Sequence, residues 1–592
     1  MWLICYIVSI VCLLGVILFC IGSIRELWGT KYKGKLFKIL FATVFLSSFV
    51  MFLPINAFES PNNFYGGVRT VFLSFFTAMQ TFGMGCEYAV VKDSLVECPS
   101  YLNKFYQVWA TFLFVLAPIF TFGFALSFFK NAISHIKYRV VYRNKDVYVF
   151  SGINERTVTL AQSIKENREK NDKNFVLIFT DVFETNEESN FELLGQVNKL
   201  GALTFKKDIL LIDFNKHSPK KSISFFTIGE DQNENLNQTL KLIELYRERD
   251  NTDIYFFSVN TQSEMLLSNI NKGKIKVRRI NEVRSLINRT LFEKGGLFFD
   301  DIPTAEDGNK HISALIVGMG QHGTEMVKAL SWFLQMEGYT YEINAFDRDP
   351  LAEEKFRRLA PELIPPEYNI RINSGYDVYT QSFEKAVSKL SNTTYVLVSL
   401  GDDDINIETA VSLRKCFERI GKEPVIQTIV YNTQQKKALE GVKNFKGKPY
   451  KIDFIGDLET SYSEDVAINS KLEEEALKVH MSYGCAKEDD FWSFEYNYRS
   501  SMASAIHHHA REICQIPGTL KKNEELTENE RDIIERLEHR RWNAYMRSEG
   551  YIYSGSDDPS TRNDLAKMHH NLTSFESLSE EDKRKDSRVA TK

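Results

Sequence analysis

A chain of 592 residues is too long for a single domain, and its length favours three or four. Its net charge of −5 excludes a nucleic-acid-binding surface that extends over the whole chain. Its eight cysteines are scattered and lack the spacing of metal ligands.

Three apolar segments near the N-terminus are long enough to cross a lipid bilayer. Residues 1–24 carry no charge, and residues 39–58 and 105–129 form comparable runs. We interpret the first segment as a retained helix, because its basic residues follow the apolar run, whereas those of a signal peptide precede it. No comparable run follows Lys130, so the remainder is expected to be soluble. The sequence therefore predicts an α-helical, three-span membrane domain over residues 1–130.

Basic residues predict the orientation of this domain. Residues 25–38 hold five lysines and arginines, and the stretch after the third span is also basic. Such residues favour the cytoplasmic side. The sequence thus predicts a multi-pass protein of the plasma (inner) membrane, with its N-terminus outside and residues 130–592 in the cytoplasm. Cys86 and Cys98 would lie outside, where they either form a disulfide or remain free thiols.

A shorter apolar stretch lies between the second and third spans. Residues 69–80 are almost entirely apolar or small but, at roughly 18 Å of helix, too short to cross the bilayer. Non-helical backbone at this depth is tolerated only where it lines a wet, protein-walled cavity. Glycines at alternate positions can turn carbonyls toward one axis, and a ring of carbonyls can replace the hydration shell of a cation. We therefore predict a re-entrant pore loop with a selectivity filter of Thr81, Phe82, Gly83, Met84 and Gly85.

The order of span, short helix, T-x-G-x-G and span resembles the pore module of potassium channels, whose filter usually reads T-V-G-Y-G. Thr81, Gly83 and Gly85 match that pattern, whereas Met84 replaces the aromatic residue that braces the filter. The resemblance implies K⁺ as the permeant ion and leaves strict selectivity open. The alternative is a plain anchor with a helix packed at the membrane surface.

The third span would line the pore. Pro118 removes one backbone hydrogen bond and Gly123 removes side-chain bulk, so this helix can bend at a gate or hinge. Lipid-facing packing accounts for both residues equally well.

The remaining chain repeats itself at an offset of about 170 residues. Each copy begins with a strand, a glycine turn and a helix, at residues 146–164 and 311–330. Later in each copy, a strand and a glycine lead to an acidic turn and to Asn235 or Asn406 at the start of a helix. Alternating strands and helices predict α/β domains with parallel sheets of the Rossmann kind.

The two glycine turns differ. Gly318, Gly320 and Gly323 form a full G-x-G-x-x-G, which permits a tight turn, close approach of a phosphate and close packing of helix on strand. Asp347 ends the next strand, where a ribose hydroxyl would be bound. The second copy is predicted to bind NAD or another adenine nucleotide, or else to keep the turn for packing alone. The first copy retains only Gly152 and is expected to be structural.

Two such domains behind a pore module resemble tandem RCK domains, which regulate potassium conductance. The resemblance covers residues 144–460 and implies a homotetramer whose cytoplasmic ring pulls on the inner helices when a ligand binds. It places a linker at residues 131–143, a first RCK domain at residues 144–300 and a second at residues 301–464. No catalytic constellation lies near the glycine turn, so no enzyme is expected.

Residues 465–592 break the repeat and are charged, aromatic and mainly helical. The stretch EHRRWNAYMRSEGY, with a later H-x-x-L and LSEEDKRKD, resembles the RyR domain, a repeat of ryanodine receptors that also occurs singly in bacterial proteins. The resemblance implies a sensor of nucleotide-derived small molecules, with His539, Arg541 and Trp542 as pocket residues. An aromatic face would hold a base, and a cation would hold phosphate. Alternatively, Trp542 belongs to the core and the arginines are solvated.

Two clusters of metal-type ligands are interpreted otherwise. The three histidines at residues 507–509 point about 100° apart on a helix and cannot share one ion. The three aspartates at residues 402–404 follow a strand and suggest calcium, although surface acids at an RCK turn are the commoner explanation. No metal site is therefore predicted.

These patterns together predict a homotetrameric, ligand-gated cation channel whose RCK ring and RyR-like domain sense a small nucleotide-type ligand. Its partners would be its own copies, the lipid membrane and that ligand, with no nucleic acid. The first alternative is a non-conducting, membrane-anchored nucleotide sensor. The second is a membrane-bound enzyme that uses the second glycine turn.

Overall fold

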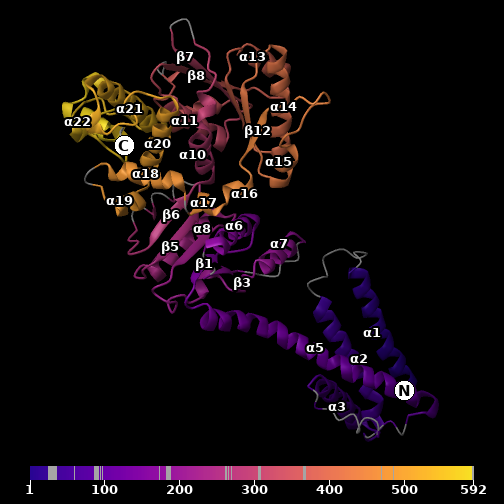
Figure 1. The fold of residues 1–592 in the computed structure, drawn as a ribbon. Helices are drawn as coiled ribbons and strands as arrows, with labels where there is room; N and C mark the ends of the chain where they lie inside the picture. The colour runs from indigo at the N-terminus through magenta and orange to yellow at the C-terminus, as the bar shows by residue number, and fades with distance from the viewer. Residues whose placement is uncertain are drawn as a thin grey trace. The chain divides into compact units, whose positions relative to one another are not determined.

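The computed structural model contains an N-terminal group of helices, two α/β sheets and a C-terminal helical group (Figure 1). Two compact units divide the chain: residues 1–154 with 175–221, and residues 155–174 with 222–592. The structure describes residues 1–24, 36–58, 60–83, 85, 93, 95, 98–171, 174–181, 188–259, 263, 266–267, 270–304, 308–364, 368–468, 470–483 and 486–589.

Buried polar contacts join the N-terminal helices of the first unit. Ser9 and Ser47 exchange hydrogen bonds, each hydroxyl lying 2.9 Å from the carbonyl oxygen of the other residue. Trp109 Nε1 donates to Ser9 Oγ at 2.8 Å. Small polar residues of this kind hold apolar helices close together where water is absent. The helices are α1 (Trp2–Ile24), α2 (Leu36–Phe58), α3 (Phe64–Phe82) and α5 (Ser100–Val141).

One helical window among the described residues, Phe41–Phe58, is long and apolar enough to cross a membrane. Trp2–Cys12 is a shorter apolar helix. The other predicted spans are helical too, since they lie within or mostly within α1 and α5. The structure thus supports one candidate membrane helix, and the three-span domain stays a prediction.

Both copies of the repeat form six-stranded α/β sheets. The first copy contains β1 (Asp146–Phe150), α6 (Glu155–Asn171), β2 (Phe175–Phe179), α7 (Glu188–Lys199), β3 (Leu203–Thr204), β4 (Ile223–Thr227), α8 (Gln232–Tyr246), β5 (Thr252–Phe257), β6 (Lys276–Ile280) and α10 (Glu282–Lys294). The second contains β7 (Lys310–Val317), α11 (Gln321–Phe333), β8 (Tyr339–Asp347), α12 (Ala352–Leu359), β9 (Ile370–Ser374), α13 (Gln381–Ser388), β10 (Tyr395–Val398), α14 (Asp403–Arg419), β11 (Val425–Ile429), α15 (Thr433–Leu439) and β12 (Ile452–Ile455).

The two sheets share one topology. The strand order of the first sheet is β3-β2-β1-β4-β5-β6, and that of the second is β12-β11-β10-β7-β8-β9. Read from its opposite edge, the second order is β9-β8-β7-β10-β11-β12, so each strand of one sheet has a counterpart in the other. Neighbouring strands pair in parallel, for example β7 with β8 and with β10. The predicted repeat, the α/β class and the parallel sheets are therefore confirmed, and the architecture is Rossmann-like.

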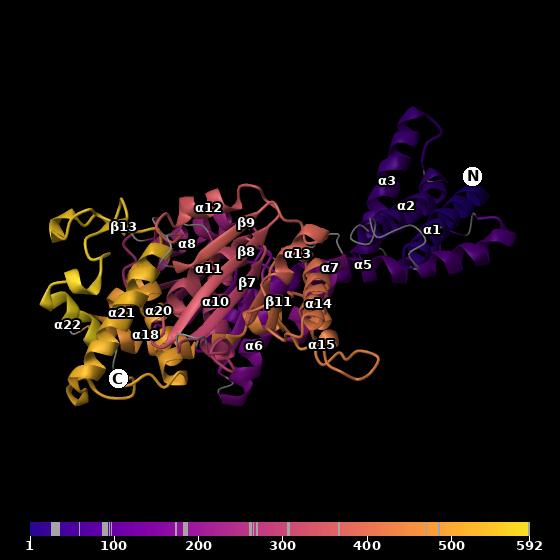
Figure 2. The ribbon, with the colours of Figure 1, turned by 90° about the horizontal axis from the view of Figure 1, so that it is seen from above.

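Helices cover both faces of the second sheet (Figure 2). One face packs against α11 and α12 through residues such as Leu330 and Phe356. The other packs against α13 and α14 through residues such as Phe383 and Leu413. Because water reaches neither face, strand β10 is apolar and buried at all four of its positions.

The C-terminal helices pack directly on the second copy, and we call residues 471–589 the C-terminal module. One hydrophobic core runs from the second sheet through α11 to α20 and α21, where Trp332 and Tyr545 meet edge to face with ring centroids 6.4 Å apart. His507 Nε2 lies 2.7 Å from the Gln335 carbonyl oxygen. The remaining elements are α16 (Leu458–Ser461), α17 (Glu464–Ala467), α18 (Lys471–Met481), α19 (Glu488–Ser493), α20 (Glu495–Ile513), α21 (Glu528–Ser548), β13 (Ile552–Tyr553), β14 (Met568–His569) and α22 (Glu580–Val589).

Candidate functional site

The predicted filter lies at the C-terminal end of α3. Thr81 and Phe82 form the last turn of this helix, so the predicted non-helical backbone is wrong for these two residues. Thr81 Oγ1 donates to the Thr77 carbonyl oxygen at 2.9 Å and stabilises the turn. Gly83 ends the helix at φ −87°, and Met84 lies outside the described residues. The short helix predicted before the filter is also longer than expected, at 19 residues.

A contact with α5 holds this end of α3. Thr121 Oγ1 donates to the Phe82 carbonyl oxygen at 2.9 Å. Before the start of α5, Cys98 is a free and buried thiol. The predicted pairing of Cys98 with Cys86 involves a residue outside the described part of the chain.

Helix α5 connects the apolar segment to the first sheet without interruption. It includes Pro118 and Gly123, the predicted gate or hinge, and continues to Val141. Near its end, the Tyr138 ring stacks on His217, with the phenol oxygen 3.2 Å from Nδ1. Phe214 meets the same ring edge to face at 5.4 Å. The C-terminal end of α5 is therefore anchored beside β3.

A cavity of about 590 Å³, which we name the sheet cavity, opens at the carboxyl ends of β7, β8 and β10. The strand order reverses between β7 and β10, and ligands of open α/β sheets bind at such a point. The predicted residues Gly318, Gly320 and Asp347 line this cavity, whereas Gly323 lies behind the turn. The sequence analysis missed other lining residues, among them His322, Arg348, Tyr376, Tyr379 and Tyr431.

The glycines of the turn have different roles. Gly318 has φ +96°, and a Cβ there would lie 2.4 Å from the Ser399 carbonyl oxygen. A Cβ at Gly323 would lie 1.8 Å from the Gly318 carbonyl oxygen, so this position requires glycine for close packing. A Cβ at Gly320 would meet nothing within 4 Å. Gly320 also begins α11 without a side-chain cap, which leaves the helix N-terminus open to an anion.

Asp347 reaches the glycine turn. Its Oδ2 accepts from Met319 N at 2.6 Å, and its Oδ1 accepts from Asp349 N at 2.7 Å. A carboxylate has about four lone-pair positions, so ribose hydroxyls can bind beside these two donors. The next residue, Arg348, is exposed and lines the same cavity, where it can meet a phosphate.

The three aspartates at the start of α14 accept hydrogen bonds from other residues of the second copy. Asp402 caps α14, Asp403 accepts from Tyr431 N at 3.0 Å, and Asp404 accepts from Gln435 Nε2 at 2.8 Å. Within the described ranges, no group of three or more His, Cys, Asp or Glu side chains is placed to hold a metal ion. The three aspartates thus act as local acceptors in this structure.

Equivalent asparagines brace both copies of the repeat. Asn406 Oδ1 accepts from Leu400 N at 2.6 Å, and its Nδ2 donates to the Ile429 carbonyl oxygen at 2.9 Å. In the first copy, Asn235 Oδ1 accepts from Gly229 N at 2.7 Å, and its Nδ2 reaches β5. Each buried amide ties the turn before a helix to the neighbouring strand, which explains why both copies carry asparagine there.

A second cavity of about 650 Å³, the module cavity, lies between α20, α21 and the chain around β14. Two of the predicted pocket residues, His539 and Trp542, line it. Their rings are nearly parallel, with centroids 6.1 Å apart, and His569 meets Trp542 edge to face at 5.0 Å. His570 and Tyr496 complete an aromatic wall that suits a planar ring. The His569–His570 doublet was the sequence signal for the missed part of this wall.

Arg541 does not line the module cavity. It is 1% exposed and holds the Glu538 carboxylate with two nitrogens, Nε at 3.0 Å and Nη2 at 2.7 Å. Arg511 is also fully buried, and its side-chain nitrogens have no hydrogen-bond partner in the described part of the chain. Burial lowers the pKa of Arg511 to about 10. The arginine that lines the cavity is Arg562, which pairs with Asp564 at 3.1 Å.

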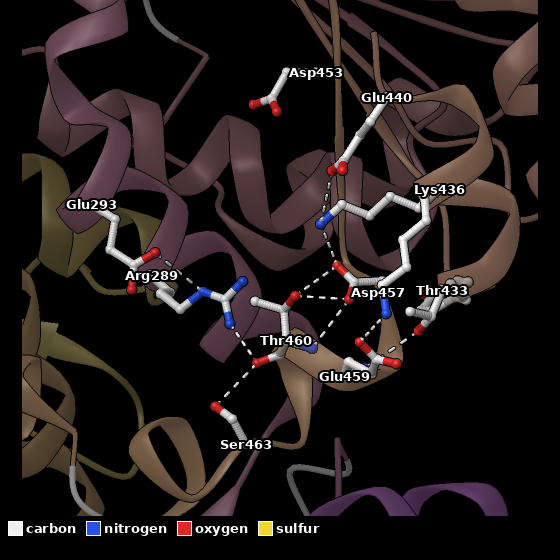
Figure 3. Close-up of polar contacts among 12 residues, drawn as sticks. Arg289, Glu293, Thr433, Lys436, Glu440, Asp453, Asp457, Glu459, Thr460 and Ser463 are labelled. Carbon is white, nitrogen blue, oxygen red and sulfur yellow. Dashed lines mark hydrogen bonds and ion pairs between the residues drawn. The ribbon is translucent and has the colours of Figure 1, made fainter. Parts of the chain in front are cut away.

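A polar network holds the segment that follows β12 (Figure 3). Asp457 is buried and accepts from Lys436 Nζ at 2.6 Å and from Thr460 Oγ1 at 2.7 Å. Burial opposes the charge of Asp457, but these donors outweigh it and lower its pKa. Arg289 Nη1 of α10 donates to the Thr460 carbonyl oxygen at 2.6 Å, and its Nε lies 3.6 Å from Glu293. The segment is therefore tied to both α15 and α10.

Comparison of the chain with models of known protein families and with curated proteins finds no match. The resemblances to potassium-channel pores, RCK domains and RyR domains therefore stay predictions. Any functional assignment rests on the residues and on the geometry described above.

The glycine turn yields a matched pair of substitutions. We expect Gly323→Ala to lower the melting temperature of the protein strongly, because the new Cβ would clash with the Gly318 carbonyl oxygen. Gly320→Ala should change the free energy of unfolding by less than about 1 kcal/mol but weaken adenine-nucleotide binding, because its methyl occupies the open side of the turn. Thermal unfolding and calorimetric titration with NAD⁺ and ATP would measure the two effects. Equal stability of both variants would contradict this geometry.

His322 yields a prediction for acid stability. Burial lowers its pKa from 6.5 to about 4. Between pH 6.5 and pH 4, the unfolded chain binds a proton at this position that the folded chain does not, so acidification destabilises the fold. We expect His322→Gln to lose less stability than the wild type over this interval, by on the order of 3 kcal/mol at most. His569, whose pKa burial also lowers to about 4, remains in both proteins and cancels in the comparison. Parallel denaturation curves at pH 7 and pH 4.5 would measure the difference.

Proposed function

We propose that the chain is the subunit of a homotetrameric, ligand-gated cation channel, with K⁺ as the permeant ion. The N-terminal helices form a multi-pass domain of three spans and a re-entrant loop in the plasma (inner) membrane. The N-terminus lies outside and residues 130–592 lie in the cytoplasm. An adenine nucleotide such as NAD in the sheet cavity, or a nucleotide-type ligand in the module cavity, controls the pore. The protein acts through binding and has no catalytic role.

The continuity of α5 is the observation that carries this proposal. One helix leads from the contact with the filter end of α3, at Thr121, to the aromatic anchor at Tyr138. A continuous helix transmits displacement along its axis, so movement of the first sheet reaches the filter end of α3 without an intervening loop. A ligand then shifts the pore equilibrium if it binds the open form more tightly than the closed form.

Two cavities of suitable size and chemistry support the ligand part of the proposal. The sheet cavity combines an open helix N-terminus with the carboxylate of Asp347, a pair that suits the phosphate and the ribose of one nucleotide. The module cavity offers a stacking surface at His539 and Trp542, and Arg562 supplies the cation there in place of Arg541. Each cavity, at 590 Å³ and 650 Å³, lies in the range of small-molecule sites.

The second candidate is a non-conducting, membrane-anchored nucleotide sensor. It is favoured by the presence of a single window, Phe41–Phe58, that is long and apolar enough to span a membrane among the described residues. One span suffices for an anchor, whereas a pore requires more. Both candidates use the same two cavities, so conduction is the property that separates them.

Currents across planar bilayers test the channel directly. The purified full-length protein, under a K⁺/Na⁺ gradient with NAD⁺ and ATP as probes, should carry a K⁺-selective or weakly selective current. Gly83→Asp should abolish it, because a charged side chain at the filter end of α3 blocks the conduction path. A wild-type protein that binds these nucleotides and stays silent would favour the anchored sensor.

The aromatic anchor of α5 tests the gating mechanism. Tyr138→Ala removes the stack on His217 and the contact with Phe214, so we expect currents that persist but no longer respond to nucleotide. Val140→Ala, an exposed position on the same helix, is the matched control and should respond as the wild type does. A Tyr138→Ala variant with full nucleotide dependence would show that the coupling follows another route.

A further inference from the structure

We propose that a third cavity binds a phosphorylated organic anion at the junction between the first copy, the segment after β12 and the C-terminal module. This joint cavity of about 590 Å³ lies between β6 and α10 on one side and α17, α18 and α20 on the other. It is separate from the sheet cavity and from the module cavity, with which it shares no lining residue. The proposal does not depend on conduction through a pore.

The joint cavity carries an excess of one positive charge. Five cationic side chains line it, from Arg279, Arg284, Arg289, Lys471 and Arg499, against four carboxylates. Arg279 and Arg499 pair with Glu495, Arg284 lies 3.2 Å from Glu549, and Arg289 lies 3.6 Å from Glu293. Glu473 contacts Arg278 at 3.2 Å, so Lys471 is the lining cation that makes no ion pair with a described residue.

Several donors in the cavity have no partner among the residues that the structure describes. The side chains of Ser285, Asn288 and Lys471 make no hydrogen bond or ion pair with any described residue. Arg289 uses Nη1 on the Thr460 carbonyl oxygen and points Nε at Glu293, so its Nη2 remains available (Figure 3). Hydroxyl, amide, ammonium and guanidinium groups together form a set of donors suited to a phosphate.

Two helices begin at the same cavity and strengthen its preference for anions. Asn281 caps the 13-residue α10, Ser470 caps the 11-residue α18, and both residues line the cavity. The partial positive charge of each helix N-terminus favours negative groups. Phe292 and Met502 line the same cavity and give an organic body an apolar surface. The occupant is therefore a phosphate attached to an organic group.

The position of the joint cavity gives this ligand a regulatory consequence. Its walls come from the end of the first copy, from the segment held by Asp457 and from helices of the C-terminal module. A ligand that contacts all of these walls stabilises their present arrangement relative to any other, by the difference in its affinity for the two states. It would act as a second effector, distinct from a nucleotide in the sheet cavity.

Titration calorimetry with phenyl phosphate on the full-length protein tests the proposal, because this probe has a phosphate and a ring but lacks ribose and base. Lys471→Gln and Arg289→Gln should each weaken binding by about tenfold, since each removes a charged hydrogen bond. Asp465→Asn should strengthen binding several-fold, because it removes an exposed carboxylate from the cavity. Lys437→Gln, an exposed lysine outside the cavity that pairs with Glu459, is the matched control.

The variants of Lys471 and Asp465 test the proposal even if a variant of Arg289 fails to fold. Lys471 and Asp465 are exposed, so their substitutions leave the fold intact even if Arg289→Gln unfolds the segment after β12. Opposite effects of Lys471→Gln and Asp465→Asn, with no effect of Gly320→Ala, would support the joint cavity. No binding by the wild type, equal effects of Lys471→Gln and Lys437→Gln, or loss of binding in Gly320→Ala would overturn it.

Discussion

The arrangement of the second unit depends on the charges that helix α11 meets at its N-terminus and on its middle turns. Its N-terminus opens into the sheet cavity, whereas Glu325 and Lys328 on its middle turns are half-buried against α10 and the C-terminal module. Arg284 contacts Glu325 at 3.1 Å and Glu549 of the module at 3.2 Å. Burial opposes the charge of Glu325, but Arg284 and Lys328 outweigh it and lower its pKa. A buried charge is tolerated only when paired, so these contacts oppose displacement of the module from α11.

This constraint places the three cavities around one set of helices. The sheet cavity lies at the start of α11, the module cavity lies on α21, which packs against α11, and the joint cavity lies along α10 and α20. The Lys328 side chain is 12% exposed, and burial lowers its pKa to about 8. A ligand in any of the cavities therefore acts on helices whose charges are already matched to one arrangement.

The N-terminal helices follow a different physical rule. Small residues of α3, such as Ser74 and Ala78, are buried within the unit, whereas its aromatic residues Phe72 and Phe76 are exposed. Asn56 of α2 donates to Ser74 Oγ at 3.1 Å. Exposed apolar faces of this kind are typical of contacts with lipid or with other chains, and our proposal includes both. At the end of α3, the Phe82 carbonyl oxygen accepts from Thr121 Oγ1 of α5.

The sequence by itself determined the repeat, the α/β class and the position of the glycine turn, because these depend on local patterns. Buried strands appear in the sequence as apolar runs. Gly318 and Gly323 indicate a turn in which a Cβ atom would clash with the backbone, and Asn235 and Asn406 indicate equivalent helix starts in the two copies. His539 and Trp542, which the RyR resemblance implied as pocket residues, line the module cavity from one helix.

Only the tertiary structure decided the rest, because it depends on contacts between residues distant in sequence. Periodicity does not reveal that Arg541 is buried on Glu538 while Arg562 faces the cavity, since both lie in polar stretches. It also cannot show that α10 and α20, some 200 residues apart, form a cationic cavity together. The helical turn at Thr81 and Phe82 was missed for the same reason. The TFGMG motif resembles a filter by its letters, whereas the conformation of Thr81 and Phe82 depends on the hydrogen bonds that this end of α3 makes.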